Sequence, residues 1–297
     1  MTALSRALKF SSWPDTEEAR DRLLDHYLIE AEAADERLRD LPPTVTPQGF
    51  SDRNGALAWL DAERSCLVAA VRMAADTGRD QAAKSLPLLM AYYLGFRGLF
   101  DDLLVVTTTS LQAARRLGDR AAEAEALTNL GLALHGLRRY HEAVTAHQDA
   151  AAIFREIGDW RGDGDALNNL GLALHGLYRN DEAVTAHQDA AAIFREIGDR
   201  YGEGKALNNL GLALHGLRRY HEAVTAHQDA AAIFRQAGHR HDEANARANL
   251  GNAWEGLGDS GQAIATYRAA ADIFRGTGDH RSELMALQSL DLAREKP

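Results

Sequence analysis

Residues 127–159 read LTNLGLALHGLRRYHEAVTAHQDAAAIFREIGD, and nearly the same letters return as residues 167–199 and 207–239. The period is 40 residues, and one phase of it holds Leu130, Leu170, Leu210, Leu250 and Leu290. A fixed period between about 20 and 50 residues is typical of a stack of supersecondary units whose hydrophobic cores join end to end. The sequence therefore predicts a scaffold whose function lies on the surface of the stack.

Each repeat carries two apolar stripes with helical spacing. The stripes consist of Leu167, Leu170, Gly171 and Leu174, and then of Ala183, His187, Ala190 and Phe194. Between the stripes, Gly176 is expected to end the first helix in a left-handed conformation and Asn180 to cap the second helix. Gly198 and Asp199 repeat this stop-and-start signal before the next unit. The pattern predicts an antiparallel helix hairpin.

These stripes resemble the signature of the tetratricopeptide repeat (TPR), which has a large residue, Leu-Gly and an aromatic position on its first helix, and Ala, aromatic and Ala positions on its second. The matching residues are Leu167, Leu170, Gly171, Leu174, Ala183, His187 and Ala190. The resemblance implies an all-α fold, a right-handed α-solenoid of antiparallel helix hairpins. The 40-residue period exceeds the usual 34, as in the longer repeats of kinesin light chains and of bacterial regulators.

The repeats divide the chain into three expected segments. Four clear repeats cover about residues 121–279, residues 80–119 fit a diverged fifth, and residues 280–295 are expected to cap the array, so the solenoid is assigned to 80–297. Residues 48–79 are expected to form a helical adaptor. Residues 1–47 are expected to form a helical segment that ends in the proline-rich linker 41–47.

The order of these segments resembles the region that joins the ATPase core to the TPR array in actinobacterial regulators of the NB-ARC/STAND class. That resemblance implies a sensor module for signal transduction that works with an ATPase domain absent from this chain. No phosphate-binding loop of the form G-x-x-x-x-G-K-[ST] occurs in the sequence.

Composition narrows the classes of partner. The formal net charge is −10 and no basic stripe is present, which disfavours direct contact with nucleic acid. The longest apolar run, residues 86–96, is too short to cross a membrane, and the single Cys66 allows no internal disulfide. The sequence therefore favours a cytoplasmic protein without a membrane segment, and no cofactor is expected.

Histidines at two phases of the repeat raise the question of metal binding or catalysis. His147, His187 and His227 fall within the second apolar stripe, where the last repeat has Tyr267, so the position is interpreted as a packing position in the core. His141 and His147 are six residues apart, about 240° around a helix, which excludes a shared zinc ion. Neither a metal site nor a catalytic site is expected, and the chain is not expected to be an enzyme.

A second set of residues lies beside the core, on the flank that lines the concave groove in TPR proteins. The expected groove residues are Thr128, Leu132, His135, Asn168, Leu172, His175, Asn208, Leu212, His215, Asn252 and Glu255. Leucines can bury apolar side chains while asparagine amides pair with an extended peptide. The flank histidines, with an ordinary pKa near 6.5, are expected to make affinity sensitive to pH, although duplication alone would also produce their column. At the fourth repeat, Asn252 and Glu255 are expected to prefer a donor or a positive charge.

Three functions follow from these observations. The favoured one is a non-catalytic scaffold that binds a protein or peptide in the groove and serves as a sensor. The alternative is self-assembly, because nearly identical units can pair with copies of themselves as homo-oligomers. An enzyme is disfavoured, because no activated nucleophile, paired carboxylates or phosphate loop accompanies the repeats.

Overall fold

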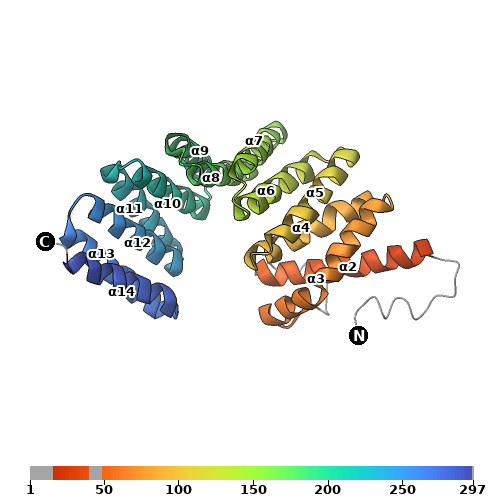
Figure 1. The fold of residues 1–297 in the computed structure, drawn as a ribbon, viewed down its shortest axis with the longest axis horizontal. Coiled ribbons are helices and arrows are strands. Elements are labelled where there is room, and N and C mark those ends of the chain that lie inside the picture. The colour runs from red at the N-terminus through yellow and green to blue at the C-terminus, as the bar shows by residue number, and fades with distance from the viewer. Residues whose placement is uncertain (1–15, 40–48, 296–297) are drawn as a thin grey trace. The chain divides into compact units, whose positions relative to one another are not determined.

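The computed structural model describes residues 16–39 and 49–295, and every regular element within these ranges is an α-helix (Figure 1). The helices are α2 (Thr16–Arg39), α3 (Arg53–Asp76), α4 (Asp80–Phe96), α5 (Phe100–Leu117), α6 (Arg120–Gly136), α7 (Tyr140–Ile157), α8 (Trp160–Gly176), α9 (Asn180–Glu196), α10 (Arg200–Gly216), α11 (Tyr220–Ala237), α12 (Arg240–Gly256), α13 (Ser260–Thr277) and α14 (His280–Glu295). The all-α prediction is confirmed. The predicted proline linker at residues 41–47 lies outside the described residues.

The helices repeat with the period of the sequence. Helices α4, α6, α8, α10, α12 and α14 begin at residues 80, 120, 160, 200, 240 and 280. We call these the A helices, and the helices that follow them (α5, α7, α9, α11 and α13) the B helices. The pairs α8–α9, α10–α11 and α12–α13 pack as antiparallel hairpins of a TPR-type solenoid, and α14 is a final A helix.

The described residues form two compact units, which divide between Ile153 and Phe154. In the first unit, one hydrophobic core includes Tyr27 of α2, Leu60 of α3, Met90 of α4 and Leu103 of α5, all fully buried or nearly so. The hydroxyl of Tyr27 also donates to Glu63 Oε2 at 3.0 Å. The expected N-terminal segment, adaptor and diverged repeat therefore share a core, and their division into separate domains stays a proposal.

In the second unit, glycine sets the distance between the helices of each hairpin. A Cβ atom placed on Gly171 would lie 2.5 Å from Cε1 of His187, and one placed on Gly251 would lie 2.4 Å from Cε1 of Tyr267. These distances are shorter than van der Waals contact, so only glycine lets the rings pack against the A helix. The Leu-Gly pair of the repeat is thus explained by the ring that follows 16 residues later.

The turns within the hairpins differ from the prediction. Gly176 is the last helical residue of α8, and the left-handed residue is Tyr178, with φ 60°. Asn180 does not cap α9, because the N-cap is Arg179 and makes no capping hydrogen bond through its side chain. Asn180 instead points back toward α8. The turn between repeats is as predicted, with Gly198 at φ 75° and Asp199 accepting from the backbone N–H of Gly202.

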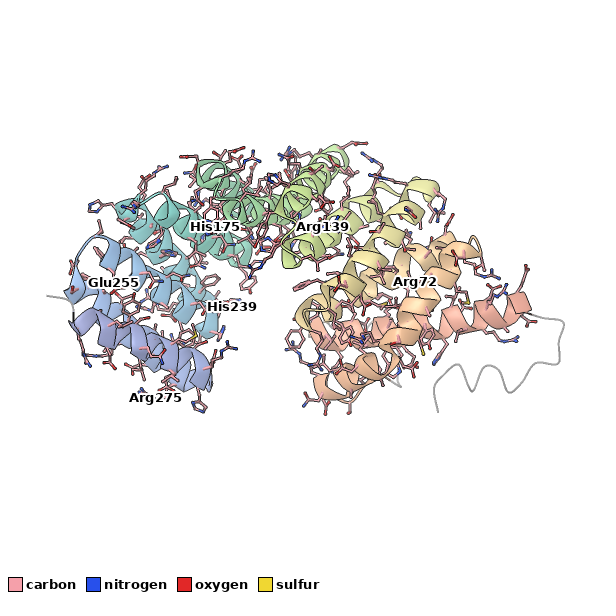
Figure 2. All side chains as sticks on the ribbon, in the orientation of Figure 1. Arg72, Arg139, His175, His239, Glu255 and Arg275 are labelled. Atoms are coloured by element: carbon pink, nitrogen blue, oxygen red, sulfur yellow. The ribbon has the colours of Figure 1, made fainter. Side chains whose placement is uncertain are left out.

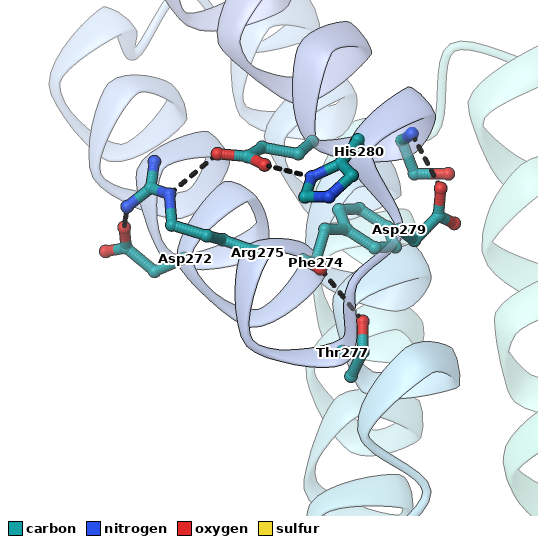
Figure 3. Close-up of polar contacts among 8 residues, drawn as sticks. Asp272, Phe274, Arg275, Thr277, Asp279 and His280 are labelled. Carbon is teal, nitrogen blue, oxygen red and sulfur yellow. Dashed lines mark hydrogen bonds and ion pairs between the residues drawn. The ribbon is translucent and has the colours of Figure 1, made fainter.

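Ion pairs between a half-exposed arginine and a buried or partly buried carboxylate join successive hairpins. The fourth residue of each A helix from α6 to α14 is acidic, and the pairs Arg115–Glu123, Arg155–Asp163, Arg195–Glu203 and Arg275–Glu283 join an A helix to the preceding B helix at 2.7–2.8 Å. Figure 3 shows the last junction, where Arg275 also contacts Asp272, and Asp279 accepts from the N–H of Ser282. A carboxylate in the first turn of a helix also interacts favourably with the helix dipole.

Within the second unit, the A helices form the inner face. Helix α8 contacts α10 and α10 contacts α12, whereas the B helices α9, α11 and α13 make no comparable contacts with one another. A stack whose A helices approach more closely than its B helices is concave on the A side. Of the helices described, none is long and apolar enough to span a bilayer.

Candidate partner-binding face

The expected groove residues lie on the A helices of the two units. Thr128, Leu132 and His135 share one face of α6 in the first unit, and Leu132 is 39% exposed. In the second unit, Asn168, Leu172 and His175 lie on α8, and Asn208, Leu212 and His215 lie on α10. Asn252 and Glu255 lie on α12. His175 and Glu255, labelled in Figure 2, are near the carboxyl-terminal ends of their helices.

Hydrogen bonds link the core histidines to the A helices. The Nδ1–H of His187 donates to Asn168 Oδ1 at 3.1 Å, and the amide of Asn209 in the next repeat donates to the same oxygen at 3.1 Å. One repeat later, His227 and Asn249 both donate to Asn208 Oδ1, at 3.0 and 3.2 Å. Each pair of hydrogen bonds therefore links a B helix to the A helix of the same hairpin and to the A helix of the next hairpin. Asn209 and Asn249 are members of this network that the sequence analysis did not single out.

This network changes the role expected of Asn168 and Asn208. Asn168 is only 6% exposed, and both oxygens accept two hydrogen bonds within the protein. Burial lowers the pKa of His187 to about 3 and that of His227 to about 4, so both rings are neutral near pH 7. Asn168 and Asn208 therefore position the hairpins, and the partly exposed Leu172 and Leu212 are the better candidates for contact with a partner.

The third core histidine has no such partner. His147 is 1% exposed, and neither its Nδ1 nor its Nε2 makes a hydrogen bond among the described residues. The reason lies in α6, where Thr128 occupies the position of Asn168 and Asn208. Its hydroxyl donates to the carbonyl of Ala124 at 3.0 Å. Burial lowers the pKa of His147 to about 3, so this ring is also neutral.

The flank histidines pack against the start of the B helix. The rings of His135 and Tyr140 meet edge to face at 5.2 Å, and those of His215 and Tyr220 do the same at 5.2 Å. His175 Nδ1 donates to Asn180 Oδ1 at 2.7 Å. Burial lowers the pKa of His135, which corrects the expectation that this residue titrates in its ordinary range.

The fourth repeat uses a different arrangement. The hydroxyl of Tyr267 lies 2.6 Å from Asn252 Oδ1 and 3.0 Å from Glu255 Oε2, and these two acceptors share its one proton. Burial and the Glu255 carboxylate raise the pKa of Tyr267, which stays protonated. Glu255 thus holds the tyrosine that replaces the core histidine, and its preference for a cationic ligand stays a proposal.

A cavity of about 400 Å³ opens between α12 and α14 on the A side of the second unit. Its lining consists of Asn208, Asn245, Ala248, Asn249, Asn252, Tyr267, Phe274, Ser282, Met285, Ala286 and Ser289. None of these side chains is charged. The cavity was not anticipated from the sequence, although Ala248 interrupts the asparagine column and could have marked it.

Two further observations concern other parts of the described chain. A cavity of about 440 Å³ in the first unit is lined by residues of α2, α3 and the following Thr77, and none of them belongs to the expected groove. One of them is Arg72, which is labelled in Figure 2. No group of three or more metal-ligating side chains occurs among the described residues.

Comparison with protein families identifies the repeat. The family model described as tetratricopeptide repeat matches residues 122–196, 162–236 and 202–276, which together make up just over half of the 297-residue chain. The chain belongs to the tetratricopeptide repeat family. No curated protein matched the sequence.

Solved structures share this TPR fold at low identity. BtubC (BKLC) from P. vanneervenii superposes with a TM-score of 0.62 at 22% identity, covering 75% of this chain and 92% of that one. A Rap protein complexed with competence and sporulation factor gives 0.59 at 15% identity, covering 93% and 87%. A STAND protein with a tetratricopeptide repeat sensor from Pyrococcus horikoshii gives 0.52 at 13% identity, covering 97% of this chain and 51% of that one. These likenesses concern the fold.

Proposed function

We propose that this TPR protein is a non-catalytic scaffold that binds a protein or an extended peptide on the A-helix face. The observation that carries the proposal is the inner face of the second unit. There Leu172 and Leu212 are partly exposed one repeat apart, beside amides held in fixed positions by the core histidines. Partly exposed leucines on successive A helices suit a polypeptide, since its apolar side chains can pack against them one repeat apart.

The comparisons supply support for this proposal from proteins of similar fold. One is a Rap protein in complex with competence and sporulation factor, and another is a STAND protein whose TPR array is a sensor. We propose by analogy that the present array is a cytoplasmic regulatory module of a signalling ATPase or transcriptional regulator. An ATPase domain would then be one of its partners.

The proposal is tested by capture from the source cytoplasm with the full chain as bait. We expect Leu172→Asp with Leu212→Asp to abolish capture of a partner that wild type retains, since two charges would be placed in the apolar part of the face. The matched control is Thr185→Asp with Thr225→Asp, which adds the same charges at exposed positions of α9 and α11. Equal capture by the two double variants would contradict binding on the A-helix face.

Self-assembly is the alternative function. Leu284, Met285 and Leu292 of the terminal helix α14 are 57–61% exposed, which gives a surface through which copies could associate. Mass measurement across protein concentrations separates the two functions, since a monomer at every concentration contradicts self-assembly.

A further inference from the structure

The cavity between α12 and α14 lies where the sequence departs from that of the preceding repeats. Repeats two and three carry Asn168 and Asn208 at a position that Ala248 occupies in the next repeat. Ser289 similarly replaces the asparagine found at Asn209 and Asn249. Duplication explains why a residue recurs at one phase of the repeat, but it does not explain why smaller side chains stand at Ala248 and Ser289 beside the cavity.

The packing of the A helices is also looser where these smaller side chains stand. Helix α10 contacts both α8 and α12, whereas α12 and α14 make no comparable contact, and the cavity of about 400 Å³ lies between them. That volume falls within the range of about 300–1,000 Å³ found for ligand pockets.

The hydrogen bonds inside the protein determine which polar atoms remain for a ligand. Asn208 and Asn252 accept through their oxygens, from His227 and Asn249 and from Tyr267 respectively. Their amide N–H groups take no part in these bonds. Asn249 donates through its nitrogen, so its oxygen is left as an acceptor. The lining therefore offers N–H donors and a carbonyl acceptor close together, which is the complement of an amide group.

The remaining walls set the charge preference. Phe274, Met285, Ala248 and Ala286 are apolar, and none of the lining residues is charged. A carboxylate or an ammonium group entering the cavity would lose water without gaining an opposite charge, which is costly. A neutral amide loses less and gains hydrogen bonds.

We propose that this cavity is a specificity pocket that admits an uncharged amide of the bound polypeptide, either the side chain of glutamine or asparagine or a backbone amide. This proposal rests on the proposed function only because the pocket opens on the same A-helix face. An uncharged lining favours a neutral group, so the pocket itself excludes acidic and basic side chains.

The test uses small probes and a built-in reporter. Met285 is the one methionine among residues 154–297, so its ε-methyl NMR signal reports on the pocket. The probes are N-acetylglutamine methylamide, the charged isostere N-acetylglutamate methylamide, the lysine analogue, and N-acetylglycine methylamide, which carries backbone amides alone. We expect the glutamine probe to shift the signal saturably with a Kd on the order of millimolar, and the glutamate probe to bind at least about tenfold more weakly.

Variants separate the pocket from general effects. Ala248→Asn restores the asparagine of the other repeats and should remove binding by filling the cavity. Ser289→Asn serves the same purpose from α14 if the first variant fails to fold. Asn252→Asp keeps the acceptor for Tyr267 but adds a negative charge, and it should shift preference from the glutamine to the lysine probe.

Each outcome bears on the proposal. Binding of the glycine probe as tightly as the glutamine probe supports the pocket and assigns it to backbone amides, whereas a preference for glutamine assigns it to a side chain. Equal binding of the glutamine and glutamate probes, binding that survives both filling variants, or no shift with any probe overturns the pocket. If partner capture still depends on Leu172 and Leu212 in that case, the proposed function stands without it.

Discussion

At the residue scale, two of the buried polar groups without partners, in His147 and Asp163, lie where one repeat departs from its copies. His147 lacks a hydrogen-bond partner because Thr128 replaces asparagine. Asp163 Oδ1 is likewise buried and unpartnered, and burial raises the pKa of Asp163.

The position of Trp160 explains the unpartnered oxygen of Asp163. In other repeats this position is an arginine, which forms a second ion pair with the buried glutamate: Arg120 with Glu123 and Arg200 with Glu203. The sequence placed the core histidines correctly, but it could not show which of them was satisfied, because that depends on the facing residue of another helix.

Thr128→Asn should supply the partner that His147 lacks. The new amide oxygen would accept from Nδ1, as in the two following repeats, and we expect the free energy of unfolding to rise by about 1 kcal/mol. Chemical denaturation of the full chain measures the change. Thr128→Val, of similar size but without an amide, is the control, and a gain in that variant equal to the gain in Thr128→Asn would show that the hydrogen bond is not the cause.

The core histidines also predict a dependence of stability on pH. Their pKa values in the folded protein, about 3 for His147 and His187 and about 4 for His227, lie below the ordinary value of 6.5. The unfolded chain therefore binds more protons below pH 6.5, and stability is lost as the pH falls through that value toward 4. Each histidine contributes a slope of up to about 1.4 kcal/mol per pH unit.

The variant that tests this origin is His187→Phe with His227→Phe. Between pH 6.5 and 4.5, the dependence of the unfolding free energy on pH should be less steep in this variant than in wild type. The expected difference corresponds to about two protons, one for each histidine removed. Thr225→Val, at an exposed position of α11 that carries no titrating group, should leave the slope as in wild type. An unaltered slope in the double variant would assign the acid sensitivity to other groups.

At the element scale, the hairpins could be predicted in kind but not in their turns. The starts of the A helices could be predicted from the 40-residue period. The apolar stripes and the Gly-Asp signal between repeats are features of neighbouring residues, so they can be recognised in the sequence alone. The predicted inner turn was wrong, because Gly176 is the last residue of α8 and the left-handed residue is Tyr178. In the neighbouring repeat, a Cβ on Gly216 would lie 2.7 Å from Nδ2 of Asn180, which shows the closeness that demands glycine there.

The same turn offers a stabilising substitution. Arg218 has φ 59°, whereas the fourth repeat places Gly258 at this position with φ 77°. A residue with a Cβ is disfavoured in this region, so Arg218→Gly should raise the melting temperature, with a gain of up to about 1 kcal/mol. Arg218→Ala removes the same side chain but keeps the Cβ, and an equal gain from alanine would show that backbone strain is not responsible.

At the scale of the whole molecule, the sequence predicted the class of fold and the face of interest more fully than the contacts on it. Membership of the TPR family and the all-α solenoid follow from repetition, which is visible in one sequence. The engagement of Asn168 and Asn208 within the protein and the cavity beside Ala248 depend on contacts between repeats, which spacing alone does not reveal. The residues proposed to contact a partner are therefore Leu172, Leu212 and the cavity between α12 and α14, in place of Asn168 and Asn208.

The most direct test of binding on the A-helix face is site-specific photo-crosslinking in the full chain. The variants Leu212→p-benzoylphenylalanine, on α10, and Thr225→p-benzoylphenylalanine, on α11, place the same reactive group on the inner and outer faces of one hairpin. With the captured partner present, irradiation should join it to the chain from position 212 and not from position 225. Crosslinking from position 225 alone, or equally from both positions, would contradict the assignment of the A helices as the binding face.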